Sequence, residues 1–145
     1  MKTRSAVRGF SLVEMLIVLA IIGIMASIVI TQMANAAVDS RRAVSRQQQV
    51  VLQEAVNNWL SQYCASSSTM SISAARTAYN AKTTAADRLS LVGPYLDPST
   101  VSQFTAMSGD TAKLQTDAMR RIGKWIEMPT WDAASYPQVN LFPVD

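Results

Sequence analysis

The sequence predicts an α+β protein in which one long N-terminal helix carries a small antiparallel β-sheet head. No glycine or proline occurs between Ile24 and Val92, and this stretch is rich in Ala, Gln, Arg and Val, which favours helix. Strand-like segments separated by turn residues occur only later, at residues 113–116, 122–128 and 138–142. A length of 145 residues suits one modest domain with an appendage.

The first element is an apolar helix over residues 10–30, preceded by the short basic segment 1–9. Twenty-one helical residues, each rising about 1.5 Å, span roughly 31 Å, which is the thickness of a bilayer core. We therefore expect residues 10–30 to cross a membrane. Glu14 lies inside this run, where a carboxylate costs about 2.5–3.5 kcal/mol at mid-membrane depth. The acid needs either a position near the headgroups or a cation.

A cut between Gly9 and Phe10 would supply that cation, because the new amino group would lie one helical turn from Glu14. The residues around this position, GFSLVEMLIVLAIIGI over 9–24, resemble the prepilin signature of type IV pilins and type II secretion pseudopilins. The signature combines a basic leader, a glycine before the cut, a phenylalanine after it and a glutamate four residues further on.

The resemblance implies how the chain is processed and assembled. Prepilin peptidase would cleave after Gly9 and methylate the amine of Phe10, and Glu14 would pair with the terminal amine of a neighbouring subunit. The implied product is a non-enzymatic subunit without a cofactor, anchored in the inner membrane with its head in the periplasm. Its implied partners are the peptidase, further copies or other pilin-like subunits, an inner-membrane assembly platform and, before assembly, the bilayer.

The second element is the amphipathic continuation of the helix over residues 31–64, which leaves residues 65–145 for the head. Its apolar stripe would cover the sheet, and its polar face carries Arg42, Arg46, Gln49, Gln53 and Asn57. The stripe consists of Met33, Ala37, Val44, Val51, Leu52, Ala55, Val56, Trp59, Leu60 and Tyr63.

Three short helices should follow the loop at residues 65–69. Ser71 or Ser73 can cap the first, which would end near Lys82. The second covers Ala85–Val92 and ends at Gly93–Pro94, and the third starts at Asp97–Pro98 and ends before Gly109. The three strand segments then complete the head.

Composition excludes several classes of function. The chain has no histidine, so Ser-His-Asp and Cys-His triads and histidine zinc sites are excluded. The net charge of +3 comes from the first nine residues, so a nucleic-acid partner is not expected. Cys64 has no second cysteine to pair with, and its small thiol suggests a buried packing residue.

Other candidate sites have ordinary structural interpretations. The late aromatic residues are expected in the core, and the basic group around Arg120 is expected on a solvated strand edge. The aspartates are scattered and lack the spacing of a calcium loop, so no metal is predicted. The aromatic residues are Trp125, Trp131, Tyr136 and Phe142, the basic group is Arg120, Arg121 and Lys124, and the aspartates are Asp110, Asp117, Asp132 and Asp145.

Two alternatives remain open. Ala34-Asn35-Ala36 fits a secretory cleavage pattern, so the chain could be a periplasmic soluble domain cut after Ala36. It could also be an uncleaved single-span membrane anchor. Within the pilin class, the absence of a cysteine pair favours a pseudopilin-like or short pilin-like subunit, and Glu14 favours a place in the shaft of a filament.

Overall fold

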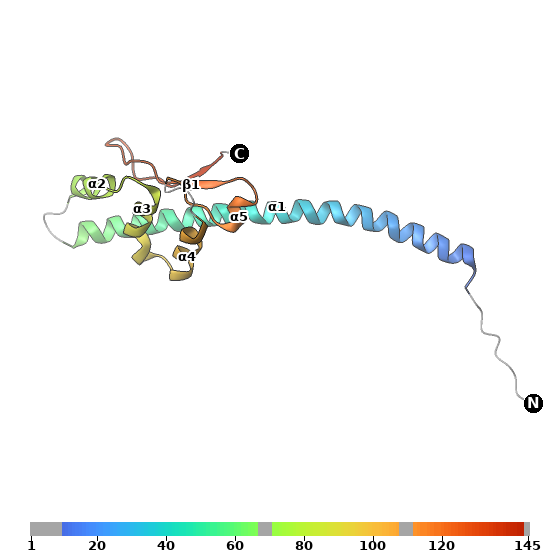
Figure 1. Ribbon diagram of the computed structural model, residues 1–145. Helices are drawn as coiled ribbons and strands as arrows, with labels where there is room; N and C mark the ends of the chain where they lie inside the picture. Colours follow the sequence, from blue (N-terminus) through green and yellow to red (C-terminus); the bar gives the residue numbers. More distant parts are fainter. Residues whose placement is uncertain (1–9, 67–70, 108–111, 144–145) are drawn as a thin grey trace, which may run out of the picture. The chain divides into compact units, whose positions relative to one another are not determined.

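A computed structural model describes residues 10–66, 71–107 and 112–143 of the chain (Figure 1). It divides into two compact units, Met1–Val38 and Asp39–Asp145. The long N-terminal helix and a two-stranded antiparallel sheet confirm the predicted α+β class. The expected segment boundaries at residues 9, 30 and 64 stay predictions.

Helix α1 extends over Leu12–Ala65 and includes residues of both units. It is uninterrupted because it contains no proline and only one glycine, Gly23, whose cost is spread over many residues of good helix propensity. In the first unit its apolar residues are exposed, whereas in the second unit its buried face includes Leu52, Val56 and Trp59. The predicted stripe therefore becomes a packing face only within the second unit.

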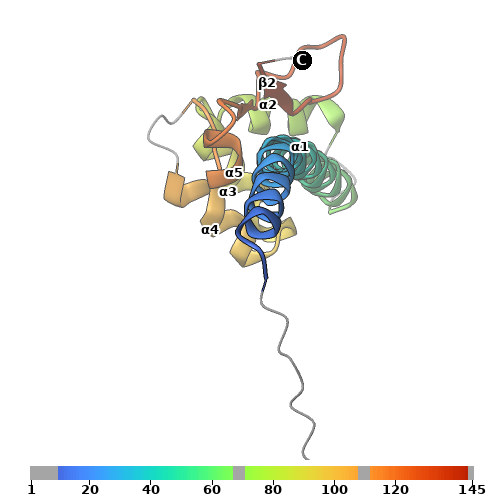
Figure 2. The same ribbon diagram turned by 90° about the vertical axis from the view of Figure 1, so that its right-hand side faces the viewer.

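Short helices surround this packing face. Helix α2 covers Ile72–Asn80, α3 covers Ala85–Val92, a 3₁₀ turn follows at Gly93–Tyr95, and α4 covers Pro98–Met107. Figures 1 and 2 together show α2 and the strands along one side of this part of α1, and α3 and α4 along another. These bounds confirm the three predicted helices. Ser71, one of the two predicted caps, caps α2 by accepting the Ala74 N–H.

The sheet is smaller than the strand patterns predict. Strand β1, Trp125–Glu127, pairs antiparallel with β2, Asn140–Phe142, so that Ile126 lies opposite Leu141. Residues 113–116 form only one bridge, from Leu114 to Ile126, and were wrongly predicted as a strand. Helix α5, Asp117–Arg120, and the left-handed turn at Gly123 intervene before β1, so the strand starts later than predicted.

Side chains of α1 substitute for a further strand beside the C-terminal segment. The Gln53 amide donates to the Pro137 carbonyl oxygen at 2.9 Å and accepts the Val139 N–H at 2.9 Å. Gln49 donates to the Val139 carbonyl oxygen at 2.8 Å. These glutamines, predicted on the polar face, thus satisfy backbone groups of the segment leading into β2 and attach it to α1.

Candidate functional site

Of the predicted assembly residues, Glu14 lies in the first turn of α1 and Phe10 lies two residues before the helix. Ser11 precedes the helix, and its hydroxyl accepts the Glu14 N–H at 3.2 Å. Glu14 is the third residue of α1, so the sequence Ser-Leu-Val-Glu has the pattern of a helix-capping box. A carboxylate in the first turn also interacts favourably with the partial positive charge of the helix N-terminus. Glu14 therefore has a local role that the sequence analysis missed, although the S-x-x-E spacing was visible.

Phe10 lies immediately before this turn, with 77% of its surface exposed, and Glu14 is also exposed. Gly9, the other residue of the predicted cleavage site, lies outside the described residues. Phe10 and Glu14 are thus both accessible at the beginning of the helix, as processing and pairing would require. Cleavage, methylation and pairing themselves stay predictions.

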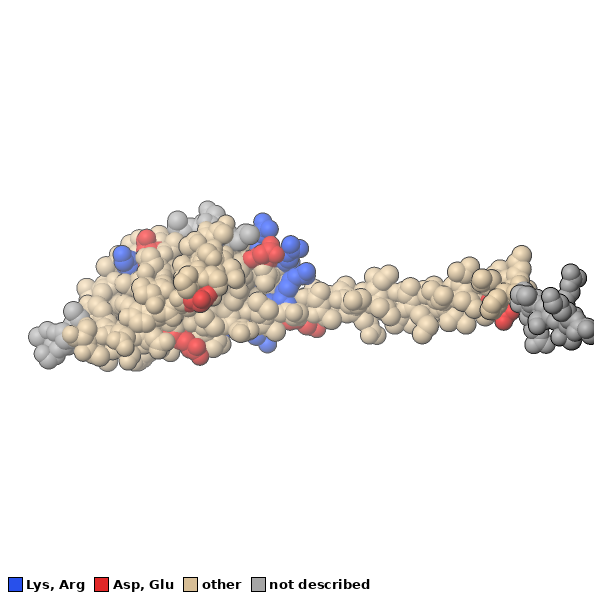
Figure 3. Space-filling view, turned by 90° about the horizontal axis from the view of Figure 1, so that it is seen from below, with Lys and Arg blue, Asp and Glu red and all other residues tan. Residues whose placement is uncertain are grey.

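The apolar side chains that follow have no partner among the described residues of the first unit. The large apolar residues from Leu12 to Met33 are exposed, and Glu14 is the only charged side chain between residues 10 and 38. Figure 3 accordingly shows this part of α1 as a nearly uncharged surface. The helix is long and apolar enough to cross a membrane. Such a surface is stable only in lipid or against other apolar surfaces.

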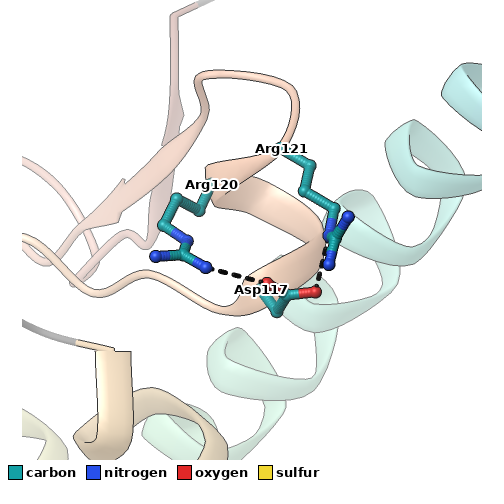
Figure 4. A network of polar contacts seen from close by, with 3 residues as sticks. All are labelled: Asp117, Arg120 and Arg121. Carbon is teal, nitrogen blue, oxygen red and sulfur yellow. Dashed lines mark hydrogen bonds and ion pairs between the residues drawn. The ribbon is translucent and has the colours of Figure 1, made fainter.

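Charged residues gather instead on the second unit, where α5 forms a small ion-pair network (Figure 4). Asp117 accepts from Arg121 Nε at 2.8 Å and from Arg120 Nη2 at 3.2 Å. These hydrogen bonds, that from Arg121 first, hold the pKa of the Asp117 carboxyl below its usual range. Arg120 and Arg121 thus lie on a helix and its end, so their prediction as a strand edge was wrong.

Lys124 also departs from the predicted solvated edge. It is buried, with 5% of its surface exposed, and its ammonium donates to the Pro143 carbonyl oxygen at 3.1 Å. Gln115 donates to the Lys124 carbonyl oxygen at 2.9 Å. Lys124 therefore anchors the residues after β2 to the start of β1, and its side chain contributes little to the surface.

The late aromatic residues and Cys64 differ in how far the structure buries them. Trp131 is buried and exchanges two hydrogen bonds with Asn80, whereas Trp125 stacks on Phe142 at the sheet and Tyr136 is 58% exposed. The aromatic group therefore belongs to the core only in part. Cys64 is half-buried against the core.

The aspartates do not assemble into a metal site among the residues that the structure describes. Asp117 is engaged with arginines and Asp132 accepts its neighbour's N–H. Asp110 and Asp145 lie outside the described residues.

Sequence reasoning missed one further feature, a buried cation in the second unit. Arg88 is 4% exposed, donates through Nη1 to the Met128 carbonyl oxygen, and lies over the ring of Tyr79. Its Nε and Nη2 atoms have no hydrogen-bond partner among the described residues. No local signal in the sequence predicts this burial. Arg88 follows Asp87 in a short amphipathic helix, where arginine is usually exposed to solvent.

Comparison with known proteins places a recognised signature at the start of the chain. A family model described as the prokaryotic N-terminal methylation motif matches residues 4–30. This motif is the signature of type IV pilin-like and pseudopilin-like precursors, so the predicted resemblance is confirmed. No curated protein and no solved structure gives a significant match to the chain.

Proposed function

We propose that this chain, which carries the N-terminal methylation motif of pilin-like precursors, is a structural subunit of a type IV pilus-like filament or type II secretion pseudopilus. Prepilin peptidase cleaves it between Gly9 and Phe10 and methylates Phe10. The subunit then leaves the inner membrane, with the help of the assembly platform, and polymerises through residues 10–30. Its head, residues 65–145, faces the periplasm and decorates the filament.

One observation carries this proposal: the exposed apolar surface of α1 coincides with the methylation motif that matches residues 4–30. A membrane anchor alone would need such a surface, but it would not need the methylation motif. Leaving lipid for a bundle of like helices gains little hydrophobic energy, because lipid chains and apolar side chains are similarly apolar. Shape and charge must therefore guide assembly.

Glu14 supplies the charge in this proposal. A carboxylate in an apolar environment is costly when unpaired and much less so beside an opposite charge. The methylated amine of Phe10 on a neighbouring subunit is the partner that we propose. Since Glu14 also occupies the capping-box position of α1, its two roles have to be separated by experiment.

Processing is tested by the intact mass and N-terminal peptide of the membrane-associated protein from its native host. We expect a chain that begins with methylated Phe10. A chain beginning at Ala37 would instead identify a secreted soluble domain, and a chain that retains Met1 would identify an uncleaved anchor. Either of these results would overturn the proposal.

The assembly role of Glu14 is tested with two matched variants in the native host. Glu14→Gln keeps a polar side chain for the helix cap and removes the charge, whereas Ser11→Ala removes the cap acceptor and keeps the charge. We expect Glu14→Gln to insert in the membrane and be cleaved but to be lost from sheared filaments, and Ser11→Ala to assemble. Normal assembly of Glu14→Gln would contradict the charge pair.

A further inference from the structure

We propose that a basic edge of the second unit binds the anionic headgroups of the membrane in which residues 10–30 are inserted. The inference rests on the proposed function only in requiring an inserted chain. The basic edge is defined by five arginines from two segments, namely Arg41, Arg42 and Arg46 of α1 and Arg120 and Arg121 at the end of α5.

The fold brings these two distant segments together. Thr116, just before α5, donates its hydroxyl to the Gln48 side-chain oxygen of α1 at 2.9 Å. Val44 of α1 and Ala118 of α5 line the same surface hollow. Arg42, Arg46, Arg120 and Arg121 are exposed and Arg41 is half-exposed. Figure 3 shows most of the visible basic side chains gathered at one end of the second unit.

The basic edge carries a surplus of positive charge. Among the described residues, Arg42 pairs with Asp39 at 3.4 Å and Arg120 and Arg121 share Asp117, so these three guanidinium groups and that of Arg41 outnumber the two carboxylates. These ion pairs are exposed and therefore weak. Each guanidinium has five N–H donors in a planar fork that matches phosphate oxygens, so donors remain available beside these pairs.

The position of the basic edge in the chain selects lipid as the partner. Ten residues lie between Ile30, where the apolar run ends, and Arg41. Helical side chains tilt toward the helix N-terminus, so Arg41 and Arg42 lean toward the preceding turn of α1. An anionic surface attracts basic groups within a Debye length of about 8–10 Å. Insertion of the same chain also gives the headgroups a high effective concentration, which no soluble acidic protein would have.

The test uses the full processed chain in nanodiscs that contain phosphatidylglycerol with a photoactivatable headgroup. We expect cross-links to peptides that contain the basic edge, and few when the reactive group is carried by phosphatidylcholine. In the double variant Arg120→Gln with Arg121→Gln, the cross-link yield should fall about fivefold or more. High salt should lower the wild-type yield in the same direction.

Asp117→Asn separates lipid binding from a merely structural role of the ion-pair network. Removing this acid frees both arginines and should raise the yield, opposite to the arginine variant. If the network served only to stabilise α5, both variants would lower the yield and weaken the near-ultraviolet circular dichroism of the second unit. The matched control, Arg76→Gln with Lys82→Gln, removes two charges near α2, away from the edge, and should leave the yield unchanged (Figure 1).

Two results would overturn the proposal while leaving the proposed function intact. One is a yield that does not depend on Arg120 and Arg121 although the chain is inserted. The other is a yield that falls in Asp117→Asn. If the cross-link yield did not depend on Arg120 and Arg121 but the arginine variant failed to assemble in cells, the partner of the basic edge would be an acidic protein. A chain that does not insert into the nanodisc would overturn both proposals.

Discussion

The guanidinium carbon of Arg88 lies 5.1 Å from the centroid of the Tyr79 ring, so that a buried cation faces an aromatic surface. Tyr79 is fully buried, and its hydroxyl has no hydrogen-bond partner among the described residues. The negative face of an aromatic ring stabilises a desolvated cation, and among the described residues no carboxylate forms an ion pair with Arg88. The pair connects α2 to α3 inside the core.

The buried phenol predicts a loss of stability at high pH. Burial raises the pKa of Tyr79 to about 12, while the charge of Arg88 acts in the opposite direction. Because an unfolded tyrosine has a pKa of about 10, this group's contribution is complete below pH about 10 and falls by roughly 2–3 kcal/mol as the pH rises through about 12. Denaturant unfolding of wild type and Tyr79→Phe in detergent micelles at increasing pH measures it.

The variant itself isolates the contribution of Tyr79. At neutral pH Tyr79→Phe should be as stable as wild type or up to about 1 kcal/mol more stable, because it removes an unpartnered buried hydroxyl. Between pH about 10 and 12 it should lose less stability than wild type. Parallel pH profiles for the two proteins would show that Tyr79 does not titrate as described.

Substitutions of Arg88 should separate its packing from its charge. Arg88→Ala leaves a cavity beside Tyr79 and removes the donor to the Met128 carbonyl, so we expect a loss of about 2–4 kcal/mol. Arg88→Met keeps most of the packing but removes the donor to Met128 together with the two unpartnered nitrogens, so its loss should be smaller, about 1–2 kcal/mol. Unfolding followed by tryptophan fluorescence compares the two variants. Equal losses would assign the stabilisation to the charge and its hydrogen bond and not to packing.

Gln53 should be the most important glutamine of α1 for stability. Gln53→Ala leaves the Val139 N–H and the Pro137 carbonyl without their partner, and we expect a loss of about 2–3 kcal/mol. Gln47→Ala, an exposed position on the same helix, should change stability by no more than about 0.5 kcal/mol. Denaturation midpoints in micelles test the pair, and similar midpoints would mean that water replaces the lost bonds.

Two glycines should differ in how much stability their replacement by alanine costs. Gly123 has φ +68, so Gly123→Ala should cost about 1–2 kcal/mol through backbone strain, although nothing obstructs the methyl group. Gly93 has helical angles, and beyond its chain neighbours an added methyl would meet Val101 at an ordinary 3.9 Å. The ring of Pro94 disfavours a Cβ at these angles, so Gly93→Ala should cost less than Gly123→Ala, about 0.5–1 kcal/mol. Thermal unfolding in micelles ranks them, and a reversed order would refute this interpretation.

Local patterns predicted the helices well. The long glycine-free and proline-free stretch predicted α1, Ser71 or Ser73 predicted the start of α2, and Gly93–Pro94 predicted the end of α3. Each of these signals acts through the residue's own backbone preferences or through a cap within three residues. They therefore required no knowledge of the tertiary structure.

The sheet was predicted less accurately because its pairing depends on distant residues. Thr116 is held by Gln48 of α1, and the next four residues form α5 and not an extended strand. The segment before β2 is bonded by Gln53, a residue more than eighty positions earlier in the chain. Interactions at this separation override local strand propensity and leave no periodic signal in the sequence.

The same distinction applies to the candidate sites. Phe10 and Glu14 could be predicted as site residues because the prepilin signature is a continuous segment, and the motif match at residues 4–30 covers the same segment. The basic edge could not, because its two groups of arginines are over seventy residues apart and meet only through the packing of α5 on α1. The burial of Arg88 likewise follows from the surrounding core and not from its neighbours in sequence.

The exposed apolar run of α1 has a consequence for how the sequence can vary over time. In the proposed life cycle, Leu16 or Ile21 passes from lipid to neighbouring helices, two environments of similar polarity, so exchanging one for Val or Met changes the transfer energy little. Such changes should also leave the stability of the second unit untouched. We therefore expect this run to drift among apolar residues of similar size, while Glu14, whose charge distinguishes the two environments, tolerates no such exchange.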